Sequence, residues 1–332
     1  MSAVRRRFRA PALAALDALR LVWAGGCALV LAAIVARGFR LGAAQYATIL
    51  TPTIAAAAVA YLAGHAVRAV RLSVLVGREA PLKRLITLHG LTAGLSMILP
   101  WKLSEAVRVG ELAANLQSLP RALATVWIER AFDFAAAMAL LALASAMGLA
   151  AHAEVRPLAL LWAIFVIASL FVFWVLPENL RQLKLMVLVR YRGAVATRLL
   201  QTLNGAEAIS RAGNSIVRAH PASLAMLTLA IWVCELTALM LATGGGVTEA
   251  IPGLLDVLSA APGGAIFAAT DFAVELNAAG AAGASALRAY QTAIVLPTLA
   301  LGAACGGAYL ALARLARRKR ELETPLMLRG IG

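Results

Sequence analysis

Two short segments place ionisable side chains within apolar surroundings. In the first, Lys102, Glu105, Arg108 and Glu111 recur every three residues with alternating charge. Side chains three positions apart are neighbours on a helix, so consecutive members of this row can form ion pairs. The spacing alone favours a solvated interfacial helix with ordinary ion pairs over a set of charges that binds an ionic ligand.

The second segment favours a set of charges that binds an ionic ligand. Glu129, Arg130 and Asp133 lie within an apolar run that extends from residue 122 to about residue 151. A charge at the centre of a bilayer costs roughly 2.5–3.5 kcal/mol on insertion scales, and such charges usually face a protein interior or a wet cavity. We therefore expect a site for a charged headgroup. A purely structural cluster of ion pairs is the alternative.

Three more ionisable residues join the predicted site. Glu235 lies in the middle of the apolar run 222–243 and has no basic neighbour in its own helix. It is either a substrate-facing or proton-accepting carboxylate, or a carboxyl group that burial keeps neutral. Asp271 is paired by spacing with Glu275, and Arg288 begins the last apolar run. The predicted substrate-binding residues are Lys102, Glu105, Arg108, Glu129, Arg130, Asp133, Glu235, Asp271 and Arg288.

Other reactive residue types indicate no chemistry. Cys27, Cys234 and Cys305 occur singly in apolar stretches, without the spacing of a disulfide framework or a zinc site. Neither a phosphate-binding glycine loop nor a nucleophile motif is present. We expect no metal, no cofactor and no catalytic residue. The four histidines, interpreted as loop or interface residues, are His65, His89, His152 and His220.

The composition indicates a membrane protein. The 332 residues are 62% hydrophobic and 14% charged, with a mean hydropathy of +0.83. Soluble domains are about 45–50% apolar and about 25% charged. We expect an all-α polytopic membrane protein, a single integral domain over residues 1–332 with about six full transmembrane helices. The net charge of +15 does not indicate a nucleic-acid partner, because cytoplasmic flanks of membrane proteins collect Lys and Arg.

The basic clusters predict the orientation. Both termini and the segments 64–84 and 177–220 are assigned to the cytoplasmic side of a bacterial-type inner membrane. The first of these segments holds Arg68 and Arg71 and follows a span expected at residues 43–63, with Pro52 as a kink. We expect this basic rim to contact anionic lipid headgroups.

Two segments have apolar arms that are too short to cross. Residues 85–119 and 251–283 each have proline near the middle, and full crossing needs about 20 residues. Both are therefore predicted to be re-entrant hairpins of opposite orientation, as in an inverted repeat with halves at about 41–151 and 222–313. The alternative for 85–119 is an ordinary span followed by an amphipathic loop helix.

A family resemblance rests on two motifs. The run Leu99-Pro-Trp-Lys-Leu-Ser-Glu-Ala-Val-Arg108 and the later Glu129-Arg-Ala-Phe-Asp133 resemble the flippase-like transmembrane domain family, which includes the membrane part of lysylphosphatidylglycerol synthases. The similarity covers about residues 64–150, where the basic patch with Arg68, Arg71 and Arg84 also fits, and is weaker over 258–312.

This sequence departs from the family pattern at several positions. Lys102 stands where the family has Arg, and Ser104 where it has Gly. The second hairpin lacks the family's Gly-x-Gly-x-x-Glu continuation, although Asp271 can stand in for its acid. A lysine lacks the bidentate contact that arginine makes with phosphate. The departures therefore bear on the substrate more than on the fold.

The resemblance implies a lipid translocase that moves an anionic phospholipid, an aminoacyl-lipid or a polyprenyl-phosphate lipid between leaflets. Only about 20 residues follow the last apolar run, so we expect no soluble aminoacyltransferase part and no lipid aminoacylation. One alternative is an accessory subunit of an envelope-lipid or polysaccharide assembly system. Another is an intramembrane lipid-phosphate transferase with Glu105 or Asp133 as base. A homo-oligomer or an envelope-biosynthesis partner is compatible with each.

Overall fold

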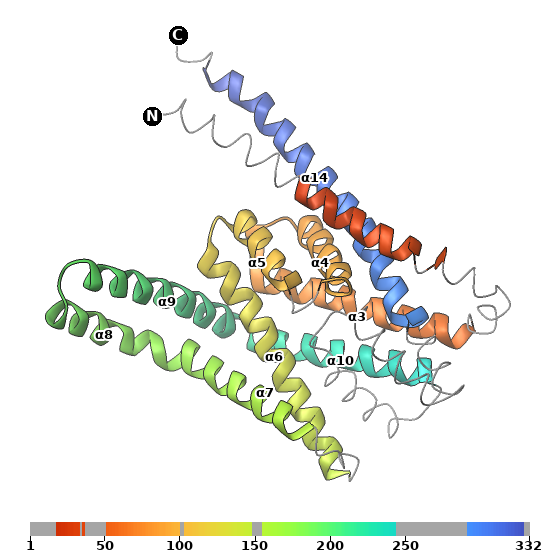
Figure 1. Ribbon diagram of the computed structural model, residues 1–332, viewed down its shortest axis with the longest axis horizontal. Helices are drawn as coiled ribbons and strands as arrows, with labels where there is room; N and C mark the ends of the chain where they lie inside the picture. Colours follow the sequence, from red (N-terminus) through yellow and green to blue (C-terminus); the bar gives the residue numbers. More distant parts are fainter. Residues whose placement is uncertain are drawn as a thin grey trace.

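The computed structural model describes residues 18–33, 35–36, 51–99, 103–147, 155–243 and 291–328 (Figure 1), and all regular structure in these ranges is helical. Four of the described helices are long and apolar enough to cross a membrane, namely Pro52–Glu79, Ala159–Arg190, Pro221–Ala242 and Ala293–Leu312. A shorter apolar helix covers Ala18–Ala33. The described residues therefore have the expected all-α architecture. The second predicted hairpin, 251–283, lies outside the described residues.

Helix α3 (Pro52–Val76) lies along α10 (Pro221–Thr243). Thr51 caps the start of α3, where its Oγ1 accepts a hydrogen bond from the Ile54 N–H at 3.3 Å. The expected kink at Pro52 is wrong, because proline lacks only an N–H that the first turn does not use. The helix continues to Gly77, whose φ of 68° suits glycine. The span is thus displaced toward the C-terminus from the expected 43–63.

Helices α4 (Leu82–Ser96) and α5 (Leu103–Leu116) are two short neighbouring arms. They contain 15 and 14 residues, so each is only about 22 Å long, below the roughly 30 Å of a hydrocarbon core. Every residue from Leu88 to Leu95 is buried. The second half of α4 is therefore enclosed on all sides, as in the interior of a bundle, whereas Leu82 and Ile86 near its start are 51% and 43% exposed.

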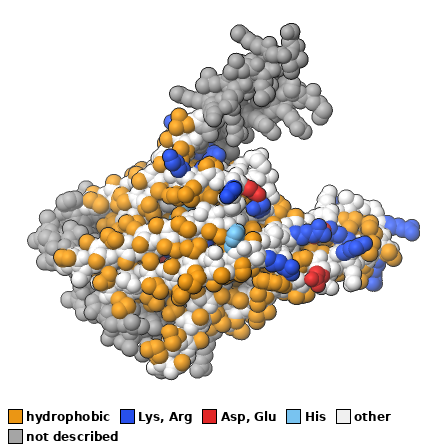
Figure 2. Space-filling view, turned by 180° about the vertical axis from the view of Figure 1, so that it is seen from behind, with side chains coloured by type: hydrophobic (Ala, Val, Ile, Leu, Met, Phe, Trp, Pro, Cys, Tyr) orange, Lys and Arg blue, Asp and Glu red, His pale blue; other side chains and the backbone are white. Residues whose placement is uncertain are grey.

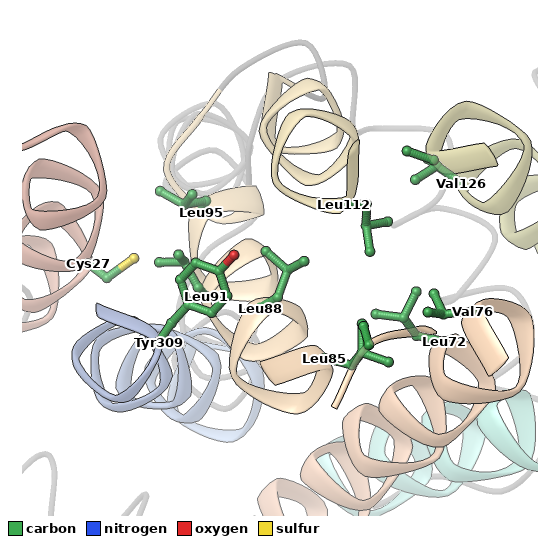
Figure 3. Packing of buried hydrophobic residues seen from close by; sticks show 12 residues of the cluster. Cys27, Leu72, Val76, Leu85, Leu88, Leu91, Leu95, Leu112, Val126 and Tyr309 are labelled. Atoms are coloured by element: carbon green, nitrogen blue, oxygen red, sulfur yellow. The ribbon is translucent and has the colours of Figure 1, made fainter. Parts of the chain in front are cut away.

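The largest apolar cluster surrounds α4 (Figure 3). Leucines 85, 88, 91 and 95 recur at helical spacing and are four of its twelve buried residues. Partners come from the helix Ala18–Ala33, from α3, α5 and α6 (Leu119–Ala146), and from the long C-terminal helix α14 (Leu296–Leu328). The labelled partners are Cys27, Leu72, Val76, Leu112, Val126 and Tyr309. The short arm α4 is thus the centre around which the longer helices pack.

Glycines allow α4 and α14 to cross closely. A Cβ atom placed on Gly94 would lie 2.6 Å from the Gly302 Cα, and one placed on Gly302 would lie 2.6 Å from the Gly94 Cα. One turn away, a Cβ on Gly90 would lie 2.4 Å from the Cys305 Sγ. The Gly94–Gly302 pair, with Gly90 one turn earlier against Cys305, lets the two backbones approach closely.

Helices α7 (Val155–Leu170) and α8 (Leu176–Arg190) are joined without a break through the π-helical turn η2 (Phe171–Val175). A π-helical turn disturbs the regular carbonyl pairing, and side chains of α9 (Gly193–Ala219) bind the carbonyls here. Ser210 donates to the Val172 carbonyl, and Asn214 Nδ2 donates to the Phe173 carbonyl at 2.6 Å. A second π-helical turn, η3 (Gln291–Val295), precedes α14, and a 3-10 turn, η1 (Gly77–Glu79), follows α3.

Candidate functional site

Helix α6 supplies two buried carboxylates and one arginine to the interior of the bundle. Glu129 and Asp133, one turn apart, are 1% and 8% exposed. Arg130 is partly exposed beside them. The helix begins at Ser118, whose side chain caps it by accepting from the Arg121 N–H, so the three charged residues lie in its third and fourth turns.

Arg71 of α3 contacts both carboxylates. Its Nη1 lies 2.7 Å from Asp133 Oδ1 and donates to Thr228 Oγ1 of α10 at 2.9 Å. Its Nε lies 3.9 Å from Glu129 Oε1. The side chain is 1% exposed, and a charge that far from water is costly unless it is paired. Arg71 therefore ties three helices together at one point.

Two more ion pairs extend the contacts to α5. Arg108 Nη2 lies 2.9 Å from Glu129 Oε1 and 2.8 Å from Oε2. Arg130 lies 2.9 Å from Glu105 and, through its other terminal nitrogen, 3.2 Å from Asp133 Oδ2. Each carboxylate of α6 is therefore shared between two arginines.

The six residues form one continuous row of alternating charge, which we call the ionic row. In order, its members are Glu105, Arg130, Asp133, Arg71, Glu129 and Arg108. Three guanidinium groups balance three carboxylates, so the row has no net charge. Such compensation is what allows apolar helices to hold six ionised groups.

Glu235 is joined to this region by a residue of another helix. Its carboxylate forms an ion pair with Arg68 of α3, one turn before Arg71. The sequence shows no basic neighbour in the Glu235 helix, and the partner comes instead from the helix that lies along it. Both side chains are largely buried.

Glu111 belongs to a separate cluster. Arg20 donates to both of its oxygens, at 2.7 and 2.6 Å, and the Tyr309 hydroxyl donates to it at 2.7 Å. Asn115 in turn donates to the Tyr309 oxygen at 3.1 Å. The every-third-residue row of the sequence is thus divided between two sites, because successive members point to different sides of α5.

Two of the four histidines are core residues. His65 of α3 and His89 of α4 are buried, and their rings face each other with 3.2 Å between Nδ1 and Nε2. Tyr61 packs edge-on against His65. The interpretation of these two as loop or interface residues is wrong, since α3 and α4 are packed together at this level. His220 is exposed, and His152 lies outside the described residues.

Several polar atoms of the ionic row have no hydrogen-bond partner among the described residues. They include the Nε–H groups of Arg71, Arg108 and Arg130 and the Oε2 of Glu105, all buried. Buried donors are normally satisfied. The row therefore contains three buried N–H groups without an acceptor among the described residues.

The assignment of Arg68 and Arg71 to a cytoplasmic rim is wrong, because α3 continues through both positions and the two side chains are paired in the core. The sequence signal that could have placed them is the apolar run Leu72 to Val76 that follows, which keeps both arginines inside a hydrophobic helix. Of the predicted site residues, Lys102, Asp271 and Arg288 lie outside the described residues.

Within the described ranges, no group of three or more His, Cys, Asp or Glu side chains is arranged to hold a metal ion. No family model, curated protein or solved structure matches the chain significantly.

Proposed function

We propose that this protein is an integral-membrane lipid translocase and that the ionic row binds the phosphate-bearing headgroup as it moves between leaflets. The observation that carries the proposal is the row itself, which places six alternating charges inside a bundle of apolar helices. Intramembrane ionisable residues are rare and mostly mark substrate or ion pathways. A non-catalytic role fits this arrangement, since every carboxylate in the row is paired with arginine.

The pairing gives a way to bind and release an anion. Arginine binds carboxylate and phosphate with the same forked geometry. A phosphate entering beside Arg130 or Arg108 can therefore replace one carboxylate and use the unpartnered Nε–H groups. When the headgroup leaves, Glu105 and Asp133 pair with the arginines again. The empty site is then electrically neutral, which limits the cost of holding it in the membrane.

The topology and the family resemblance support the same proposal. Translocation sites of inverted-repeat transporters lie where short, broken helices meet near the midplane. Here the short arms α4 and α5 are packed among longer helices, and α5 contributes two members of the row. Five of the row's residues belong to the motifs that resemble the flippase-like family, namely Glu105, Arg108, Glu129, Arg130 and Asp133.

Some features of the proposal extend beyond the described residues. We infer that 251–283 forms the opposing hairpin and that Lys102, Asp271 and Arg288 complete the site. We also place the protein in a bacterial-type cytoplasmic membrane with both termini inside. Substrates are an anionic phospholipid, an aminoacyl-lipid or a polyprenyl-phosphate lipid, and a second copy or an envelope-biosynthesis partner accompanies the protein.

A headgroup-accessibility assay in proteoliposomes tests the function. Purified protein is expected to accelerate exchange of a fluorescent anionic phospholipid between leaflets, measured as the fraction that a membrane-impermeant reductant can reach. Arg130→Ala is expected to abolish this exchange and leave the elution profile in detergent unchanged, because Arg130 is at the partly exposed end of the row.

Arg121→Ala is the matched control, since Arg121 belongs to α6 but pairs with Glu79 at the surface and not with the row. Wild-type exchange in Arg130→Ala would show that the row is structural, as in an accessory subunit. Failure of the wild-type protein to move any anionic lipid would exclude a translocase.

A further inference from the structure

The continuous helix that contains α7 and α8 is longer than a bilayer is thick. From Ala159 to Arg190 it has 32 residues, or about 48 Å, against a hydrocarbon core of about 30 Å. Its first half is the strongly apolar part, and a strongly tilted helix of this length leaves the core near the start of α8 and keeps α8 close to the headgroup layer. After Tyr191 and Arg192 the chain turns back and α9 packs along α8. We call residues 176–220 the α8–α9 hairpin.

The outer side of α8 is apolar and exposed in its second half, after Glu178 and Gln182 on the same side. Leu185, Met186 and Val189 share one side of the helix, and they are 55%, 58% and 87% exposed. The side that faces α9 holds Leu180 and Lys184 instead. An exposed apolar strip of this kind usually marks a surface that contacts a partner or a membrane.

Arginines border this strip. On α8, Arg181 lies toward one edge of the apolar side and Arg190 toward the other, and Arg192 and Arg198 follow at the turn and on α9. None of these four forms an ion pair within the part of the chain that the structure describes. Figure 2 shows Lys and Arg gathered over this projecting end, with hydrophobic side chains between them.

The local charge is strongly one-sided. Residues 176–220 contain seven Lys and Arg but only two acids, Glu178 and Glu207. Glu207 is already paired with Lys184 and Arg211. A second copy of the same surface would meet it with like charge, and a hydrophobic partner alone would leave the arginines uncompensated. An apolar strip between arginines complements a layer of phosphate headgroups above acyl chains.

We propose that the α8–α9 hairpin lies on the anionic surface of one leaflet, with Leu185, Met186 and Val189 in the acyl-chain boundary and Arg181 and Arg190 on lipid phosphates. This contact is distinct from headgroup binding in the ionic row and does not depend on translocation. It fixes the outer end of an element whose inner end packs on the site helices, through Phe173 and Ile216 against Leu75 and Ile128.

Fluorescence quenching in nanodiscs tests the contact. The full chain with Val189→Cys carries an environment-sensitive thiol label and is quenched by neutral acrylamide. Unsubstituted protein gives the background from the native cysteines. In nanodiscs of phosphatidylcholine with phosphatidylglycerol, the label is expected to emit at shorter wavelength and to be quenched severalfold less than in detergent. The label should be less protected from acrylamide in nanodiscs of phosphatidylcholine alone.

Adding Arg181→Gln and Arg190→Gln is expected to remove the dependence on phosphatidylglycerol, whereas Arg78→Gln, an exposed arginine outside the hairpin, should retain it. Equal quenching in detergent and in both kinds of nanodisc would overturn the proposal. Protection that is already present in detergent and accompanies a dimeric mass would also overturn it, because the occupant would then be a second copy. Neither result depends on whether lipid exchange occurs.

Discussion

Arg71 on α3 and Asp133 on α6 are joined by a buried ion pair with 2.7 Å between Nη1 and Oδ1, although 62 residues separate them in sequence. The same guanidinium donates to Thr228 of α10. Three helices therefore meet at one arginine, and the position of Asp133 between Arg71 and Arg130 depends on it. This contact is both part of the proposed headgroup site and a joint of the bundle.

Because of this second role, removal of the Arg71 side chain should destabilise the fold. We expect Arg71→Ala to lower the free energy of unfolding by about 3–5 kcal/mol, because Asp133 and Glu129 lose a buried counter-charge. Thermal unfolding in detergent, followed by size-exclusion fluorescence, measures the loss. The double variant with Asp133→Asn should lose less than the sum of the two single variants. Additive losses would mean that the two residues are not energetically coupled.

Glu105 should compete with the headgroup for Arg130. Glu105→Gln removes that competition at a partly exposed position, so folding should be retained while anionic lipid binds severalfold more tightly. Lipid release should slow, and lipid exchange with it. The concentration of phosphatidylglycerol that gives half of the maximal thermal stabilisation reports the affinity.

Glu79→Gln is the control for Glu105→Gln, because Glu79 pairs with Arg121 at the surface. It should leave both the affinity and the exchange rate unchanged. An unchanged affinity in Glu105→Gln itself would show that Glu105 does not occupy the place of a phosphate.

A side chain added at the glycines where α4 and α14 cross should destabilise the fold. Gly94→Val places its Cβ only 2.6 Å from the Gly302 Cα, and we expect a loss of roughly 1–3 kcal/mol in stability from overpacking. Gly110→Ala on α5 is the matched control, since nothing lies within 4 Å of the added Cβ. It should be neutral or stabilise by up to about 1 kcal/mol. Equal thermal stability of the two variants would contradict a close crossing.

The α8–α9 hairpin should carry a pH-dependent contribution to stability. The hydrogen bond from Lys184, together with Arg211, lowers the pKa of Glu207 below its ordinary 4.5. A lowered pKa in the folded state means that the ionised carboxylate stabilises the fold at neutral pH. This contribution fades as the pH falls below 4.5 and through the folded pKa.

The matching variant is Glu207→Gln. The difference in melting temperature between wild type and variant is expected to be positive at pH 7 and to shrink toward zero in acid. Melting curves recorded for both proteins across this pH range give that difference directly. A difference that stays constant with pH would show that Glu207 acts through packing and not through its charge.

The order of apolar and charged residues was enough to predict part of this structure. The composition predicts an all-α membrane protein, and the described residues are helical with four helices long enough to cross. The short arms around residues 85–119 are visible in the lengths of their apolar runs. Glu129, Arg130 and Asp133 stand out because an apolar helix rarely holds charges. Each of these signals is local, so periodicity and length alone reveal it.

The choice of partner, by contrast, was decided by the tertiary structure. Helical spacing shows that Glu105, Arg108 and Glu111 occupy one helix, but not that Glu111 pairs with Arg20 and Tyr309 while the other two join the ionic row. The sequence places Arg71 in the basic rim, and only the structure shows that α3 continues through it. Ion pairs between helices depend on crossing angles and depth, and these arise only when all the helices pack together.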